Sequence, residues 1–131
     1  MSRWSTIPSL FWLLCASATL LAPDPASAHA YVDMSTPADR STLPQAPTEV
    51  RLRFTETVEL AFSRITVKSS SGRTVIKGAL RQPAPNTLAI DLEPLEPGTY
   101  RIEWRVLSVD THITDGVLRF AIAPRRTGTG P

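Results

Sequence analysis

The residues best suited to bind a metal ion are the two histidines of the chain, His29 and His112, and the aspartate Asp110. Asp110 and His112 are separated by one residue and directly follow an alternating apolar stretch. Side chains two positions apart in an extended chain lie on the same face, so these two can point at one ion. Such a pair in a loop is more often simply solvated, and a metal site would need further donors.

His29 follows a segment with the features of a secretory signal peptide. Arg3 supplies a positive charge, residues 10–22 are apolar, and Ala26-Ser27-Ala28 fits the cleavage pattern of a signal peptidase. We predict that residues 1–28 are removed on export, which leaves a mature chain of 103 residues that begins with His29. Ala28-His29-Ala30 has the same pattern and stays open as the alternative site, although cleavage there would discard His29.

An N-terminal histidine offers two nitrogen donors, its α-amine and its imidazole Nδ1, in a six-membered chelate ring. The amine has a pKa of about 8, so it can lose its proton near neutral pH when a metal competes for the lone pair. With a nitrogen of His112 and an oxygen of Asp110, the donor set would be three nitrogens and one oxygen, which favours Cu(II). Spacing alone does not show that His29 meets the other two. Soft Cu(I) lacks ligands, because Cys15 is in the predicted signal peptide and Met34 is alone.

The composition excludes other kinds of site and partner. The formal net charge is +2 and the arginines are scattered along the chain, so nucleic acid is not expected as a ligand. A single cysteine excludes an intrachain disulfide and a cysteine-rich zinc site. We expect a monomer, because no feature of the sequence would drive assembly.

The elements that must position these residues are predicted to be strands. We predict an all-β fold, an Ig-like antiparallel Greek-key β-sandwich over residues 29–123 with Trp104 at its core, followed by a disordered tail at 124–131. Binding groups usually lie in the loops at the ends of such a sandwich. The alternation of apolar and polar residues indicates about seven short strands, at residues 31–34, 50–55, 65–67, 74–76, 88–92, 100–106 and 118–122.

Several motifs of the predicted domain resemble the CopC family of periplasmic copper-resistance proteins. The most specific combination runs from the turn Pro97-Gly98-Thr99-Tyr100 through Trp104-Arg105-Val106 to Asp110-Thr111-His112. The resemblance extends over essentially the whole mature chain. Further matching stretches are His29-Ala30-Tyr31, Ser35-Thr36-Pro37-Ala38-Asp39, Val50-Arg51-Leu52-Arg53-Phe54-Thr55-Glu56 and Gly116 to Phe120.

The resemblance implies a β-sandwich that binds one Cu(II) in the periplasm and takes part in copper homeostasis or resistance. Carried over by position, the ligands are His29, Asp110 and His112. Glu56 resembles a family acidic residue that orients the N-terminus, although a solvated carboxylate at a strand end is the equal alternative. A membrane partner of the CopD type in the inner membrane would be a separate polypeptide.

Two other functions fit parts of the pattern. A copper brace, as in lytic polysaccharide monooxygenases, also uses an N-terminal histidine, but those enzymes are larger, and Asp110 would occupy a position that oxygen chemistry needs. We therefore expect a binding protein and no enzyme. The second alternative is an Ig-like structural module without metal, which predicts no rise in melting temperature with Cu(II).

Overall fold

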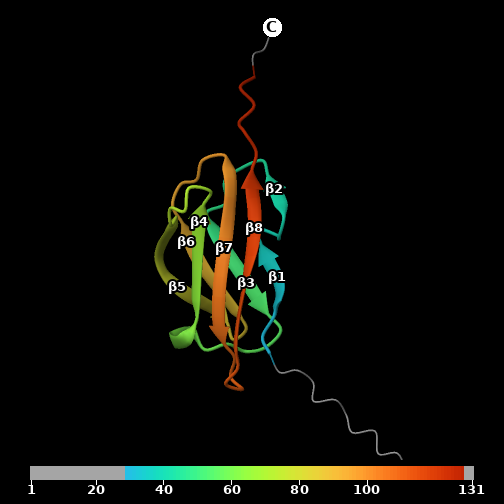
Figure 1. Ribbon diagram of the computed structural model, residues 1–131, viewed down its shortest axis with the longest axis vertical. Coiled ribbons are helices and arrows are strands. Elements are labelled where there is room, and N and C mark those ends of the chain that lie inside the picture. Colours follow the sequence, from blue (N-terminus) through green and yellow to red (C-terminus); the bar gives the residue numbers. More distant parts are fainter. Residues whose placement is uncertain (1–28, 129–131) are drawn as a thin grey trace, which may run out of the picture.

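Two four-stranded β-sheets pack face to face in the computed structural model, which describes residues 29–128 (Figure 1). The predicted signal peptide, residues 1–28, and the end of the predicted tail, residues 129–131, lie outside the described residues. One sheet has the order β1-β3-β6-β5 and the other β2-β8-β7-β4. The strands are β1 (Val32–Thr36), β2 (Ser41–Leu43), β3 (Glu49–Phe54), β4 (Arg64–Ser69), β5 (Ile76–Ala84), β6 (Thr87–Leu92), β7 (Gly98–Leu107) and β8 (Ile113–Ile122).

The predicted all-β sandwich is confirmed, with eight strands in the described chain where seven were expected. The additional strand is β2, which has only three residues and pairs in parallel with the end of β8. The other neighbouring strands of the described chain pair antiparallel, as predicted, and β2–β8 is the one parallel pair. Only β5–β6 and β7–β8 are neighbours both in sequence and in a sheet, so the other connections between described strands do not join adjacent strands.

The core lies between the sheets and is formed by the inward residues of each alternating strand. In β7, Tyr100, Ile102, Trp104 and Val106 are buried, while the residues between them face outward. The Trp104 ring packs edge-to-face on Phe54 of β3, with 5.4 Å between ring centroids. The predicted central position of Trp104 is thus confirmed.

One glycine makes room for this tryptophan. Gly116 of β8 is opposite Trp104 in the register, and a Cβ atom there would lie 2.7 Å from the indole ring. The lack of a side chain at Gly116 also hides the alternation in the first half of β8, which explains why this strand begins five residues before its predicted start.

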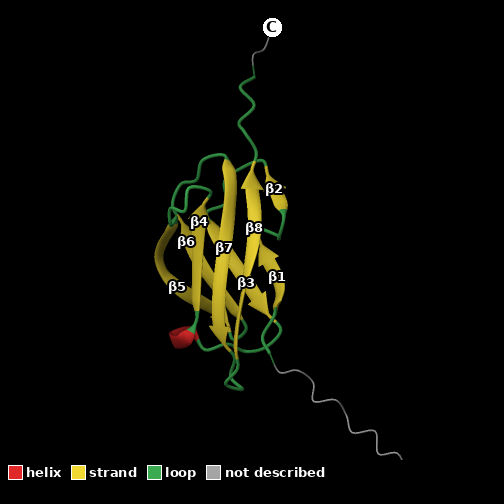
Figure 2. Cartoon of the chain, in the orientation of Figure 1, coloured by secondary structure: helices red, strands yellow, loops and turns green. Residues whose placement is uncertain are grey.

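The strands, shown in yellow in Figure 2, are joined by loops and one short helical turn, η1 (Leu60–Phe62). η1, the loop between β7 and β8, and the start of β1 lie at the same end of the sandwich (Figure 1). Among the described residues no helix is long and apolar enough to cross a membrane. The end that holds these three segments is the one that positions the candidate site.

Candidate metal centre

The segment that carries His29 is fastened to both sheets before β1 begins. The Thr114 hydroxyl of β8 donates a hydrogen bond of 2.6 Å to the Ala30 carbonyl. On the other side, the Tyr31 N–H donates to the Thr55 hydroxyl at 3.1 Å, and the Thr55 N–H donates to the Tyr31 carbonyl at 2.9 Å. Ala30 itself is fully buried. These contacts direct His29 toward the loop between β7 and β8.

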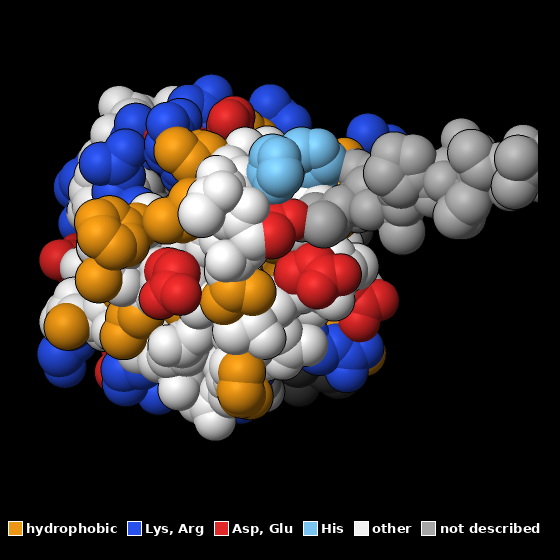
Figure 3. Space-filling view, turned by 90° about the horizontal axis from the view of Figure 1, so that it is seen from below, with side chains coloured by type: hydrophobic (Ala, Val, Ile, Leu, Met, Phe, Trp, Pro, Cys, Tyr) orange, Lys and Arg blue, Asp and Glu red, His pale blue; other side chains and the backbone are white. Residues whose placement is uncertain are grey.

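His29 and His112 lie next to each other, although 83 positions separate them in the sequence. Their ring centroids are 4.6 Å apart and the rings meet edge to face, at 71°. Figure 3 shows the two pale blue histidines side by side on this end of the molecule, with acidic side chains next to them. The His112 side chain is 54% exposed, so an ion in solution can reach it.

A tight turn holds the other two predicted ligands. The Thr111 N–H donates to the Ser108 carbonyl, and the Ser108 N–H donates to the His112 carbonyl, both at 2.9 Å. Thr111 has a φ of 70°, a left-handed conformation that is unusual for a β-branched residue and costs about 1–3 kcal/mol. Such strain is typically kept where a turn must present specific side chains.

Asp110 is oriented by hydrogen bonds to one of its two carboxylate oxygens. Its Oδ1 accepts a short hydrogen bond from the hydroxyl of the buried Ser108, and a long one of 3.4 Å from the His112 N–H. The Ser108 hydroxyl, and to a smaller extent the His112 imidazole and N–H, hold the pKa of Asp110 below its ordinary value against the opposing effect of burial. Asp110 is therefore a carboxylate at neutral pH.

The second carboxylate oxygen of Asp110 has no hydrogen-bond partner among the described residues. Asp110 Oδ2 is shielded from solvent and accepts no hydrogen bond, which is unusual for a buried polar atom. His112 Nδ1 lies 3.2 Å from it, within ion-pair distance but not in hydrogen-bond geometry. Two neighbouring ligands of one metal ion, each about 2 Å from it, are separated by about 3 Å. The spacing of these two atoms therefore suits a shared ion.

The described side chains do not complete a metal cage by themselves. Among residues 29–128 no three His, Cys, Asp or Glu side chains are already arranged to enclose an ion. The predicted donor set includes one group that is no side chain, the α-amine of His29, which exists only after cleavage at Ala28. The structure places His112 next to both His29 and Asp110, and the predicted amine donor would exist only in a chain that begins at His29.

Glu56 is exposed and lies in the loop after β3. Its carboxylate makes no hydrogen bond or ion pair within the described residues. The residues on either side connect it to the site: Thr55 bonds to Tyr31, and the Thr57 carbonyl accepts a 3.1 Å hydrogen bond from the Val109 N–H. Its predicted role beside the N-terminus stays a prediction.

Two residues without a predicted role organise the site, Ser108 and Thr114. The sequence does offer a pattern that points to Ser108, because this residue continues the two-residue spacing of Asp110 and His112. No such pattern points to Thr114, because its partner, the Ala30 carbonyl, is 84 residues away.

Comparison with known proteins identifies related copper proteins. The family described as the CopC domain matches residues 32–123. Copper transport protein CutJ of Bacillus subtilis is 32% identical over 115 residues, which are 86% of this chain and only 21% of CutJ. Copper resistance protein C of Xanthomonas campestris pathovar juglandis is 32% identical over 113 residues, which are 80% of this chain and 88% of that protein.

A solved structure agrees with the sequence comparison. The crystal structure of CopC from Methylosinus trichosporium OB3b aligns with a TM-score of 0.68 at 32% identity, over 76% of this chain and 98% of that one. On the family match, the identity to relatives and this shared fold, the chain belongs to the CopC family.

Proposed function

We propose that this chain is a periplasmic protein that binds one Cu(II) ion and buffers or delivers copper, with the N-terminal amine and the side chains of His29, Asp110 and His112 as ligands. The observation that carries the proposal is the convergence of the two histidine rings, 4.6 Å apart, beside a buried carboxylate oxygen that accepts no hydrogen bond. Its relatives CutJ and copper resistance protein C are named for copper transport and copper resistance.

The donor types favour the cupric ion. Imidazole, amine and carboxylate are ligands that suit Cu(II), whereas Cu(I) prefers thiolate and thioether sulfur. Met34 lies on β1 and is 54% exposed, and the remaining methionine and cysteine of the chain precede residue 29. A single Cu(II) per chain is therefore the stoichiometry that the donors support.

The working form proposed here is a monomer that starts at His29 after export. Copper is its cargo, and no catalytic step is proposed for it. An inner-membrane transporter of the CopD type, as a separate polypeptide, is the proposed acceptor or donor of the ion. The open position of His112 would let such a partner take over one ligand at a time.

The amine is the donor that can be tested most selectively. One glycine inserted ahead of His29 leaves every side chain in place but separates the terminal amine from the imidazole, so the six-membered chelate ring is lost. We expect the Cu(II) affinity, measured by competition with a chelator, to fall by at least about 100-fold, the effect of about 2.7 kcal/mol. The matched control is one glycine appended after Pro131, which should leave the affinity unchanged.

The exported protein must also begin at the right residue. The intact mass of the chain recovered from the periplasm is expected to correspond to a start at His29. A start at Tyr31 would remove two of the proposed donors and contradict the site. If the glycine-extended chain bound Cu(II) as tightly as the normal chain, the amine would not be a ligand, but the three side chains could still be.

A further inference from the structure

The fold gathers five cationic side chains on one outer face. β4, β7 and β8 are adjacent strands, and strand alternation turns the residues between the buried positions toward solvent. We call this surface the basic face. It carries two acidic residues, Glu103 and Asp115, and five cations, Arg64, Lys68, Arg101, Arg105 and Arg119.

The cations of the basic face lie opposite one another in the register. Lys68, Arg101 and Arg119 form one row across the three strands. Arg64 and Arg105 form a second row, which ends at the acidic Asp115 of β8. Like charges directly opposite each other destabilise a sheet. The Glu103 carboxylate forms ion pairs with both Lys68, whose Nζ lies 3.1 Å from Glu103 Oε2, and Arg101. One negative charge thus compensates two positive charges only in part. Within residues 29–128, the other three arginines of the face form no ion pair.

The excess of positive charge is confined to the basic face, as the outer face of the opposite sheet shows. Its outer acids Asp33, Glu49 and Asp91 are all within ion-pair distance of an arginine of the same sheet. Charge is thus nearly balanced on one sheet and unbalanced on the other, although the net charge of the chain is only +2. This local excess of cations is complementary to a negatively charged surface.

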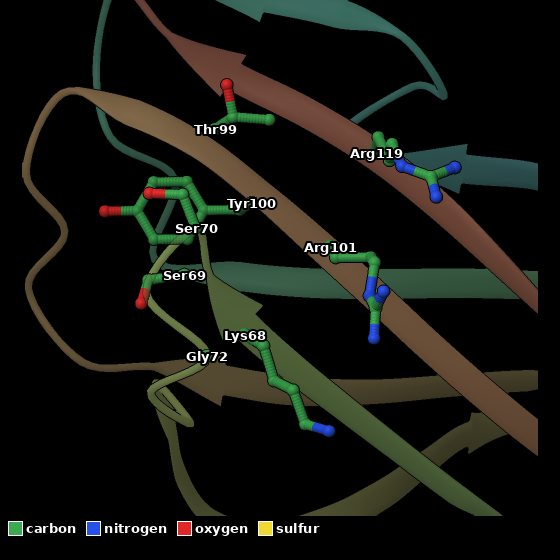
Figure 4. Close-up of a pocket in the computed structure, with 8 residues that line it drawn as sticks. All are labelled: Lys68, Ser69, Ser70, Gly72, Thr99, Tyr100, Arg101 and Arg119. Atoms are coloured by element: carbon green, nitrogen blue, oxygen red, sulfur yellow. The ribbon is translucent and has the colours of Figure 1, made fainter.

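The shape of the basic face suits small anionic groups. Next to the row of Lys68 and Arg101, the turn after β4 leaves an open hollow of about 260 Å³, bordered also by Ser69, Gly72 and Arg119 (Figure 4). Small-molecule sites are typically deeper and occupy about 300–1,000 Å³. A shallow hollow lined by cations and hydroxyl groups matches a phosphate headgroup better than an enclosed ligand.

Apolar side chains border the basic face where it approaches the histidines. The register places Leu107 opposite Ile113 beyond the row of Arg64 and Arg105, and Ile113 is 54% exposed. Phe62 of η1, at the same end, is 72% exposed. Figure 3 shows orange side chains and Lys and Arg side chains on the flank beside the histidines. Cations next to exposed apolar groups are the combination by which proteins bind an anionic bilayer.

We propose that the basic face docks on a bilayer that contains anionic phospholipid, with Ile113 and Phe62 at the level of the headgroups. This contact needs no copper, so it stands or falls separately from the proposed metal site. It would hold the histidine end near the membrane and confine exchange with a membrane-bound acceptor to two dimensions.

The test is cosedimentation of the mature chain with vesicles. We expect it to bind vesicles of phosphatidylcholine mixed with phosphatidylglycerol, to release on raised salt, and not to bind phosphatidylcholine alone. The double variant Arg64→Gln/Arg105→Gln should lower the partition coefficient about 25-fold, which is about fivefold for each cation. Both side chains are exposed and unpaired in the described chain, so the change leaves the fold intact.

The matched control removes the same charge from the other sheet. Arg51→Gln/Lys77→Gln should retain binding, because both residues lie on the opposite sheet. If both double variants lost vesicle binding equally, net charge alone would explain the binding, and the proposal that the basic face docks on the bilayer would be wrong. If the wild-type chain did not bind the anionic vesicles, the proposed contact with lipid would be wrong, and an acidic protein surface would be the better partner for the basic face.

Discussion

Ser108 is the residue on which the orientation of the proposed ligands depends most. Its hydroxyl donates to Asp110 Oδ1 and also lies 3.0 Å from the His112 carbonyl. The side chain is 1% exposed, so water does not replace these contacts. Ser108 therefore directs the unbonded oxygen of Asp110 toward His112 without itself being a ligand.

Replacing Ser108 with alanine is expected to weaken copper binding while the fold persists. Loss of a hydrogen bond to a metal ligand typically lowers metal affinity about 10- to 100-fold, and we expect a decrease in that range by chelator competition. The pKa of Asp110 should rise at the same time, because its main stabilising donor is gone.

Ser63→Ala is the matched control for this variant. The Ser63 hydroxyl donates to the Glu59 carbonyl at 2.7 Å and lies at the same end of the molecule, but it does not contact Asp110. Its affinity should stay at the wild-type value. A Ser108→Ala variant with unchanged affinity would show that Asp110 is no ligand or needs no orientation.

The residue-level prediction from sequence was limited by distance along the chain. Asp110 and His112 could be paired because a two-residue spacing places side chains on one face. The proximity of His29 depended on a family resemblance, since no local pattern reports a contact between residues 29 and 112. The orientation of Asp110 depends on the Ser108 hydroxyl, whose contact with the carboxylate is visible only in the folded turn.

At the scale of elements, β8 holds the N-terminal segment in place through Thr114. Thr114→Val keeps the shape of the side chain but removes the 2.6 Å hydrogen bond to the Ala30 carbonyl. We expect the free energy of unfolding to fall by about 1 kcal/mol. The Cu(II) affinity should fall about fivefold, because the metal must then order a looser segment. Thr66→Val, on the outer side of β4, is the control and should change neither quantity.

β7 and β8 also depend on a close contact at Gly116. In Gly116→Ala the new methyl group would meet the Trp104 ring at 2.7–2.9 Å, and the ring is confined by Phe54. Overpacking of this kind costs about 1–3 kcal/mol. Urea unfolding should therefore show a lower midpoint with an unchanged slope. Gly128→Ala meets nothing within 4 Å and should leave the midpoint unaltered.

The strands that were predicted well are those with uninterrupted alternation. β3 and β7 match their predicted positions closely because one face of each is buried along its length. The strand predicted at residues 74–76 overlaps β5 only at Ile76, because Gly78 with a φ of 74° and irregular pairing with β6 interrupt the alternation of β5. β2 depends on three residues and a partner strand far along the chain, which no local pattern indicates.

At the scale of the whole molecule, the two sheets differ in how their charges are balanced. On the sheet opposite the basic face, the hydrogen bond from Arg81 is the main cause that lowers the pKa of Glu49 below its ordinary value of 4.5. A carboxylate with a lowered pKa stabilises the fold above that ordinary value, and the contribution is lost as the pH falls through the lowered pKa.

Arg81→Gln should therefore lower the melting temperature at neutral pH, and the difference from the wild type should shrink as the pH falls below 4.5. Calorimetry across this range measures both. The control Arg125→Gln, in the segment after β8, should show no such dependence. A difference that stays constant with pH would contradict a role for the Arg81–Glu49 contact.

We propose that the folded, cleaved chain holds one Cu(II) through three nitrogens and one oxygen. The most direct test is a Cu(II) titration of the periplasmic protein followed by electron paramagnetic resonance. We expect a single signal that saturates at one ion per chain and shows hyperfine coupling to nitrogen. This signal should be lost in His112→Ala. A spectrum of hydrated copper, or a signal that His112→Ala leaves unchanged, would contradict it.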